Sequence, residues 1–150
     1  MDTGAAAVHG ALCDPRVSEK AQERGAVILN VGNQHTLGVL LVRGRILGLF
    51  EHHTSLLTSR KLQEYVERLR KGHLTPGEVF QDGGHGNLYH PDSDNLFPWE
   101  FVAVTGPRRQ LAIGLDCYFA VPQGDMMLAG CFGLVRAALR FSCKCILKEC

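Results

Sequence analysis

Three short runs of apolar and β-branched residues, joined by brief polar turns, limit the folds open to this chain more than any other feature. The runs cover residues 27–31, 36–42 and 46–50, and the dipeptide Arg43-Gly44 separates the last two. Runs of this length and composition are typical of β-strands, and a two-residue turn joins neighbouring strands of a hairpin. The first two runs are almost continuously hydrophobic, which indicates a sheet covered on both faces. The sequence therefore predicts a three-stranded meander in an α/β domain.

A helix is expected directly after the meander. Thr58 is its candidate N-cap, and Gly72 follows its last turn. An apolar stripe at helical spacing would face the core and consists of Leu62, Tyr65, Val66 and Leu69. The segment Thr75-Pro76-Gly77-Glu78 has the form of a capping box, with Pro76 at the first helical position, for one further short turn through Phe80.

The second half of the chain combines an irregular segment with further strands and a helix. Residues 81–99 are rich in Gly, Asp, Asn, His and Pro without periodicity, and we expect an irregular loop of functional importance. Strands are expected at residues 101–104 and within 111–121. Asp125 is expected to cap an apolar helix from Met126 to about Leu139 that is buried on most of its circumference, and the tail after Arg140 is expected to fray. A meander followed by α/β units is the order of a ribonuclease-H-like half of the actin-type ATPases.

The N-terminal segment predicts a domain that belongs to a longer protein. Asp2-Thr3-Gly4 is placed like a helix cap ahead of the small-residue stretch from Ala5 to Leu12. A short Ala-rich helix gains little stability by itself, so we expect it to pack against a neighbouring domain. Residues 1–150 are therefore interpreted as a single domain, the C-terminal half of a two-domain parent whose N-terminal half is a partner.

Composition excludes several classes of partner. The 16 basic and 15 acidic residues nearly cancel, and no stretch of one sign reads as a nucleic-acid or membrane footprint. No leader pattern is present, and no apolar run approaches the ~20 residues that cross a bilayer. The six cysteines are scattered rather than arranged as a disulfide framework. We therefore expect a cytoplasmic protein that binds neither nucleic acid nor membrane.

The turn between the first two strands is the strongest candidate for a binding site. It reads Asn30-Val31-Gly32-Asn33-Gln34-His35-Thr36 and carries amides, an imidazole and a hydroxyl. Such a turn can present backbone N–H groups to a phosphate, with Gly32 allowing close approach and Thr36 adding a hydroxyl donor. The alternative is a hairpin whose polar residues satisfy one another, and the local pattern leaves both open.

Histidines and carboxylates near the end of the third strand suggest further chemistry. Potential metal ligands are Glu51, His52, His53, Asp82, His85, His90 and Asp92. Because adjacent strand residues point to opposite sides, at most one of His52 and His53 can enter a given site; His52 and His85 are the metal candidates. Glu51 and Asp82 are the candidate catalytic carboxylates. The alternative is that Glu51 caps the sheet and Asp82 closes an Asx turn.

Several motifs in order resemble a known family. They are the hairpin, Gly48 to Thr54, Asp82 to Gly86, Thr105 to Arg109 and Gly124 to Leu128. Together they are similar to an uncharacterised prokaryotic family that carries the label "pyruvate formate-lyase activating enzyme" and is grouped with the actin-like ATPases. The resemblance extends to about Leu139.

The resemblance implies roles for two turns. In the actin-like superfamily an Asp-x-Gly-x-x-x-Thr hairpin faces the β- and γ-phosphates of ATP, and a later glycine turn lies near the adenosine. Thr105-Gly106 occupies the order of the adenosine turn. The hairpin matches as Asn30, Gly32 and Thr36, with Asn33, Gln34 and His35 between them.

This chain departs from the family patterns at two points. Asn30 stands where the superfamily has Asp, and a neutral amide cannot hold Mg²⁺ through water as a carboxylate does. Nucleotide binding is therefore better supported than ATP hydrolysis. Radical activating enzymes hold an iron–sulfur cluster with Cys-x-x-x-Cys-x-x-Cys spacing, and none of the six cysteines makes it; Cys143-Lys144-Cys145 is too close.

Three hypotheses about function follow. The first is an actin-like nucleotide-binding domain, part of an ATPase or small-molecule kinase that uses ATP and Mg²⁺ and no iron–sulfur cluster. The second is a non-catalytic binding or regulatory module of the same fold, which the loss of the acid at Asn30 favours. The third is a metal-dependent hydrolase that uses the His/Asp loop.

Overall fold

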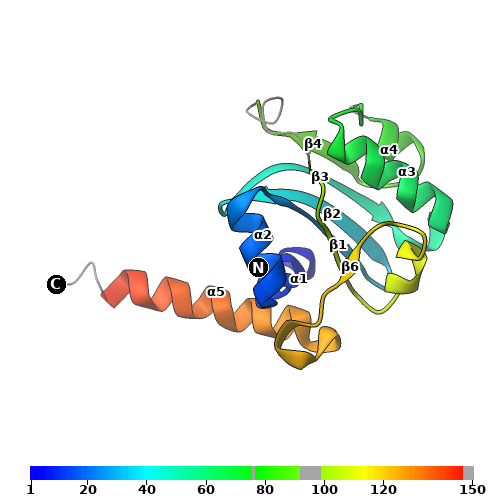
Figure 1. Ribbon diagram of the computed structural model, residues 1–150. Coiled ribbons are helices and arrows are strands. Elements are labelled where there is room, and N and C mark those ends of the chain that lie inside the picture. The colour runs from blue at the N-terminus through cyan, green and yellow to red at the C-terminus, as the bar shows by residue number, and fades with distance from the viewer. Residues whose placement is uncertain (76, 92–98, 147–150) are drawn as a thin grey trace.

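A computed structural model describes residues 1–75, 77–91 and 99–146, and these form a mixed α/β domain around one six-stranded sheet. The sheet order is β4-β3-β2-β1-β5-β6, so the central strand β1 separates a meander from two later strands (Figure 1). The strands are β1 Ala26–Val31, β2 His35–Val42, β3 Arg45–His53, β4 Gly86–Tyr89, β5 Val102–Thr105 and β6 Tyr118–Phe119.

The predicted meander is confirmed. β1 pairs antiparallel with β2, and β2 pairs antiparallel with β3. Arg43 and Gly44 both have positive φ, 48° and 77°, as the two central residues of a type I′ hairpin turn require. The register of β2 and β3 shifts between Leu40 and Leu41, so Leu47 is an extra residue on β3. Beyond this bulge His35 lies opposite His53.

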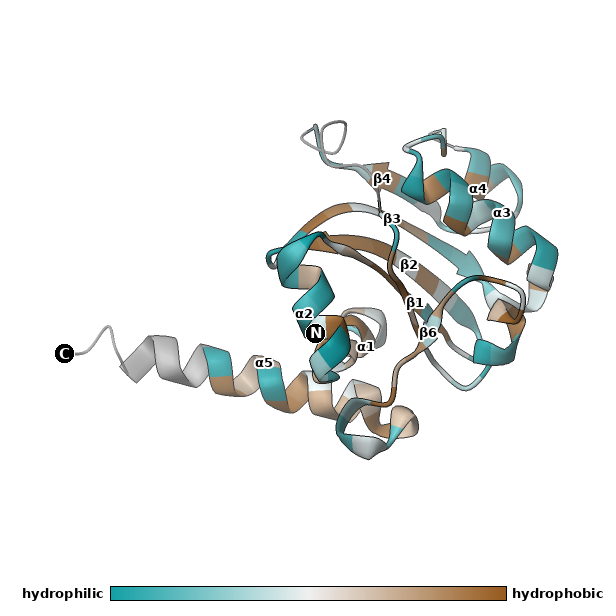
Figure 2. Ribbon diagram, in the orientation of Figure 1, coloured by the Kyte–Doolittle hydropathy of each residue, from teal (hydrophilic) through white to brown (hydrophobic). Residues whose placement is uncertain are grey.

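Helices cover both faces of the sheet, as the hydrophobic strands predicted. α3 (Ser59–Arg70) and α4 (Glu78–Gln81) lie on one face, and α1 (Thr3–Ala11) and α2 (Pro15–Glu23) lie on the other (Figure 1). The apolar residues of the strands lie between these layers, whereas the outer surfaces of α2 and α3 are hydrophilic (Figure 2). The predicted stripe of α3, formed by Leu62, Tyr65, Val66 and Leu69, is buried.

The strand β1 contributes to both hydrophobic cores. Val27, Leu29 and Val31 pack with α3 residues, and Ala26 and Ile28 pack with α1 and α2 residues. All five are fully buried. Burying a valine, leucine or isoleucine side chain contributes about 1.5–3 kcal/mol, so β1 anchors the fold on both sides.

The loop expected over residues 81–99 contains a strand. β4 pairs antiparallel with β3, with Leu49 opposite Leu88. Tyr89 holds this edge strand in place, because its hydroxyl donates to the carbonyl oxygen of Leu69 and accepts from the N–H of Leu74. The expectation of an irregular loop is therefore wrong for residues 86–89, and Asp92 lies outside the described residues.

The predicted capping box is formed in part. The carboxylate of Glu78 accepts hydrogen bonds from the N–H and the hydroxyl of Thr75, at 3.3 and 3.0 Å. Helix α4 begins only at Glu78, after Gly77 at a φ of 87°, and so starts later than the sequence predicted. Pro76 lies outside the described residues.

A second N-terminal helix, α2, was missed by the sequence analysis. Its cap is Asp14, whose carboxylate accepts from the N–H groups of Arg16 and Val17. The same carboxylate accepts from the hydroxyl of Tyr118 and the N–H of Val121. Asp14 therefore joins the N-terminal helices to the far edge of the sheet.

The C-terminal helix differs from its prediction in length and burial. Asp125 accepts from the N–H of Met127 as a cap, but a 3₁₀ turn (Met126–Leu128) precedes α5 (Ala129–Ile146), which continues past Arg140. Leu134, Val135 and Leu139 are 48%, 59% and 63% exposed, so the expected burial is wrong. No helix among the described residues is long and apolar enough to cross a membrane.

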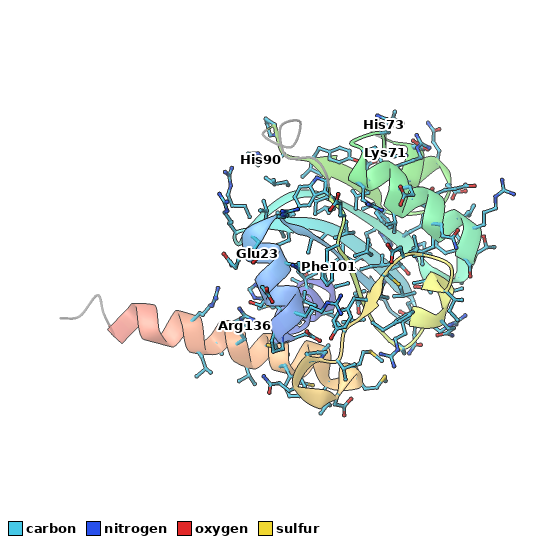
Figure 3. The ribbon with its side chains drawn as sticks, viewed as in Figure 1. Glu23, Lys71, His73, His90, Phe101 and Arg136 are labelled. Carbon is cyan, nitrogen blue, oxygen red and sulfur yellow. The ribbon has the colours of Figure 1, made fainter. Side chains whose placement is uncertain are left out.

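Helix α1, for which we expected a neighbouring domain, packs on α5 within this chain, and glycines allow the close approach. A Cβ at Gly133 would overlap the carbonyl oxygen of Ala6, and one at Gly10 would overlap that of Ala129. Arg136, which is labelled in Figure 3, donates a hydrogen bond from its guanidinium to the carbonyl oxygen of Leu12. The remainder of α5 extends away from the sheet (Figure 1).

Replacement of Gly133 by alanine should separate α5 from α1. Its added methyl group meets backbone rather than a flexible side chain, so we expect a loss of about 1–3 kcal/mol in the free energy of unfolding. Gly130→Ala is the matched control, because a Cβ there meets nothing within 4 Å and should stabilise the helix by up to about 1 kcal/mol. Denaturant unfolding of the two variants measures this contrast, and equal stabilities would contradict the packing.

Candidate functional site

The candidate site lies at one end of the sheet, where the topology gathers five strand ends. β1 and β3 run in the same direction because both are antiparallel to β2, and β5 is parallel to β1. These three strands therefore end where β2 and β4 begin. Most of the candidate residues belong to this end, whereas His90 lies at the opposite end of β4, where its N–H donates to the carbonyl oxygen of Leu47.

The hairpin and the turn after β5 are in contact. The hydroxyl of Thr105 donates to Oδ1 of Asn30 at 3.3 Å. The N–H of Arg108 donates to the carbonyl oxygen of Val31 at 3.0 Å. Gly106 has a φ of 102°, and a Cβ there would overlap the backbone of Val31. The predicted phosphate hairpin and the predicted adenosine turn thus lie directly against each other, through residues that are buried at Val31, Thr105 and Gly106.

Several polar groups of the hairpin are engaged within the protein. Thr36 is fully buried, and its hydroxyl is 2.9 Å from the hydroxyl of Thr54. The N–H of Gly32 donates to the carbonyl oxygen of His35 at 3.0 Å, and a Cβ at Gly32 would lie 2.7 Å from that oxygen. Asn33 and Gln34 are exposed. The groups free to meet a ligand are therefore those of the exposed tip.

A cation stands beside this surface. Arg109 begins the 3₁₀ turn Arg109–Ala112 that follows the β5 turn. Its guanidinium carbon lies 5.8 Å from the centroid of the Phe119 ring. Its Nη1 is buried and has no hydrogen-bond partner among the described residues. Arg109 therefore retains an unused donor at the same end of the sheet.

Three histidines form a cluster next to the hairpin. His35 begins β2, His53 ends β3 opposite it, and His85 precedes β4, its N–H donating to the carbonyl oxygen of Glu51 at 2.9 Å. The ring centroids are 4.6–5.0 Å apart. One nitrogen from each ring can be chosen so that all three lie within 4.8 Å of one another.

The surroundings of His53 favour the neutral form of its ring. Partial burial, together with the adjacent His85 and His35 rings, lowers the pKa of His53 below its ordinary value. The carboxylate of Glu51 acts in the opposite direction on the same ring. Glu51 is two residues before His53 on β3, so its side chain belongs to the same face of the sheet.

A separate network surrounds Asp82 on the other face of the sheet. Its carboxylate accepts from Nζ of Lys61 at 2.7 Å and from the hydroxyl of Tyr65 at 2.9 Å. Nε2 of the fully buried His52 lies 3.3 Å from the same carboxylate, close enough for a charge contact but not aligned as a hydrogen bond. The hydrogen bond from Lys61 lowers the pKa of Asp82, whereas burial and the Asp82 contact raise that of Tyr65.

The structure divides the residues that the sequence grouped for chemistry. His52 faces α3, where its ring lies 5.4 Å from that of Tyr65, and it is not a member of the histidine cluster. His85 joins His53 and His35 instead. Glu51 and Asp82 belong to different faces of the sheet. The alternation of side chains along a strand predicts that His52 and His53 point to opposite sides, but it does not connect His35 with either of them.

A comparison with protein families identifies the family of the chain. The family model described as "Putative pyruvate format-lyase activating enzyme (DUF1786)" matches residues 1–111. The chain belongs to this family. The expected resemblance is confirmed, and the grouping with the actin-like ATPases stays a prediction. A sequence search of curated proteins finds no match.

The residues that match the family model include the candidate site, but they lack the cysteines that the activity named in the family's label would need. Residues 1–111 include the hairpin, all three clustered histidines and the turn after β5. The same range contains one cysteine, Cys13. An iron–sulfur cluster of the radical type needs three cysteine ligands at close spacing, so the matched region of this chain cannot supply them.

Replacement of Asp82 by asparagine should destabilise the fold in a pH-dependent way. Because Lys61 lowers the pKa of Asp82, the stabilisation is fully present above the unfolded value of about 4 and is lost as the pH falls through the lower folded value. Thermal melting of wild type and Asp82→Asn should therefore differ at pH 7 and converge in strong acid. Asp116→Asn, at an exposed position, is the control; a pH-independent difference for Asp82→Asn would contradict the ion pair.

Proposed function

We propose that this chain is a nucleotide-binding domain of the actin-like ATPase kind, with a ribonuclease-H-like fold. The strand order supports this proposal. A three-stranded antiparallel meander is followed, on the far side of β1, by two strands parallel to β1. Helix α3 separates the meander from those strands in sequence. This is the arrangement expected from the resemblance, with β4 as an additional edge strand.

The contact between the hairpin and the β5 turn carries the functional proposal. Thr105 bonds Asn30 at 3.3 Å, and Arg108 bonds Val31 at 3.0 Å. A ligand with a phosphate at the hairpin and a base near Gly106 would span two turns that are already in contact. A preformed surface of this kind avoids the cost of ordering two separate loops on binding.

The charges of the surface favour binding over hydrolysis. Nη1 of Arg109 has no hydrogen-bond partner in the part of the chain that the structure describes, and charge-assisted hydrogen bonds to phosphate are among the strongest in proteins. Asn30 is neutral, and its oxygen already accepts from Thr105. It therefore holds Mg²⁺ less well than a carboxylate would. Binding of ATP or ADP with Mg²⁺, completed by the N-terminal half of a parent protein, is the function supported best.

Titration with nucleotide tests the proposal. Addition of Mg-ATP or Mg-ADP to the isotope-labelled chain should shift the amide resonances of Asn33, Gln34 and Gly106 saturably, with a dissociation constant no weaker than about 1 mM. Adenosine without phosphate should bind more weakly than either nucleotide. The absence of any saturable shift at about 10 mM nucleotide would contradict the proposed nucleotide binding.

Arg109 provides a sharper version of the same experiment. Arg109→Gln should weaken nucleotide binding by about tenfold or more, since a hydrogen bond to a charged group contributes about 1.5–3 kcal/mol. Arg60→Gln is the control, because Arg60 is 89% exposed and its charge contact is with Glu64 on α3. Equal nucleotide affinities of the two variants would show that Arg109 does not contact the nucleotide.

A further inference from the structure

The histidine cluster brings together three side chains of a type that commonly binds metals. Within the described part of the chain, no hydrogen bond reaches the ring nitrogens of His35, His53 or His85. The rings instead contact one another. His35 and His53 are half-buried and His85 is exposed. Packing alone does not require three polar rings to converge at a partly solvent-exposed end of the sheet.

We propose that His35, His53 and His85 bind one divalent transition-metal ion of the zinc class. Three neutral imidazole nitrogens suit Zn²⁺, Co²⁺ or Ni²⁺, whereas Mg²⁺ and Ca²⁺ require oxygen ligands. Three protein ligands with a fourth, open position are the pattern of catalytic rather than structural zinc sites. The exposure of His85 leaves that fourth position to water or a substrate atom.

The backbone positions fit this assignment. Tetrahedral zinc with bonds of about 2.0–2.1 Å holds its ligand atoms about 3.3 Å apart, and the three nitrogens now lie within 4.8 Å of one another. Rotation of the histidine side chains would bring the nitrogens to that spacing without any movement of the backbone. His35 and His53 are direct partners in the β2–β3 ladder, and the N–H of His85 is bonded to Glu51 at 2.9 Å.

The location gives the metal a role in the proposed function. His35 is the last residue of the hairpin turn, and its carbonyl oxygen accepts the N–H of Gly32 at 3.0 Å. A metal here would stand beside the phosphate surface and could polarise a bound phosphate oxygen or water. This role rests on the proposed nucleotide binding, whereas the metal site itself does not.

Metal binding is tested first without nucleotide. Cys143, Cys145 and Cys150 are first replaced by serine, so that the terminal thiols do not compete for the metal. This variant is then titrated with Zn²⁺ in the presence of a chelating dye. We expect one tightly bound ion per chain. Absence of stoichiometric binding would overturn the proposal.

Single histidine variants locate the ion. His35→Ala, His53→Ala and His85→Ala should each weaken Zn²⁺ binding by at least about 100-fold, since even changes in outer-shell partners cost 10–100-fold. His73→Ala is the matched control, because His73 is exposed, lies between α3 and α4 beside Lys71 (Figure 3), and is not a member of the cluster. Equal affinity in His85→Ala and His73→Ala would refute the assignment.

Two further readouts protect these tests from misfolding and from confusion with nucleotide binding. Circular dichroism confirms the fold of each variant, and the ring resonances of the three histidines should move with Zn²⁺ while those of His73 stay unchanged. Because no nucleotide is present, loss of Zn²⁺ binding contradicts only the metal site. Absence of ATP-induced shifts contradicts only the nucleotide proposal.

Discussion

The burial of β1 on both faces is the constraint on which the rest of the structure depends. Val27, Leu29 and Val31 belong to one core, and Ala26 and Ile28 belong to the other. A shift of one residue would exchange these sets between cores of different shape, so the register of β1 is strongly specified. Both edges of the strand are also paired, with β2 and with β5. The end of β1, and with it the hairpin, is therefore fixed in place.

The parts of the fold that the sequence predicted are those that local patterns specify. The meander, helix α3 and strand β5 have apolar runs or stripes of the proper period, and Arg43-Gly44 is a turn that needs positive φ. β4 has no such pattern and depends on Tyr89 reaching α3. The burial of α5 was overestimated because hydrophobicity alone does not say that only the face with Ala129, Gly133 and Ala137 is buried. These features arise from tertiary contacts.

A β-bulge in β3 prevents the membership of the histidine cluster from being predicted from the sequence. Continued regularly from the Arg43-Gly44 turn, the β2–β3 register would set His35 opposite His52. The extra residue Leu47 shifts the ladder, so His35 lies opposite His53 instead. Because side chains alternate along a strand, this one-residue shift decides which histidine shares a face with His35. Nothing in the sequence at Leu47 marks it as a bulge, since it is an ordinary buried leucine.

The two faces of β3 carry different groups: His52 packs toward α3 on one face, and His53 belongs to the histidine cluster on the other. His52 is held between Tyr65 and Asp82, and its Nδ1 lies 3.1 Å from the carbonyl oxygen of His53. A Cβ at Gly84 would lie 2.7 Å from Cδ2 of His52, so the chain that leads to His85 passes directly against this ring. Asp82, the candidate catalytic carboxylate, thus lies against His52, and His52 lies against the backbone that leads to His85. A ligand cluster on a sheet end needs such support, because binding requires side chains held close to their productive geometry.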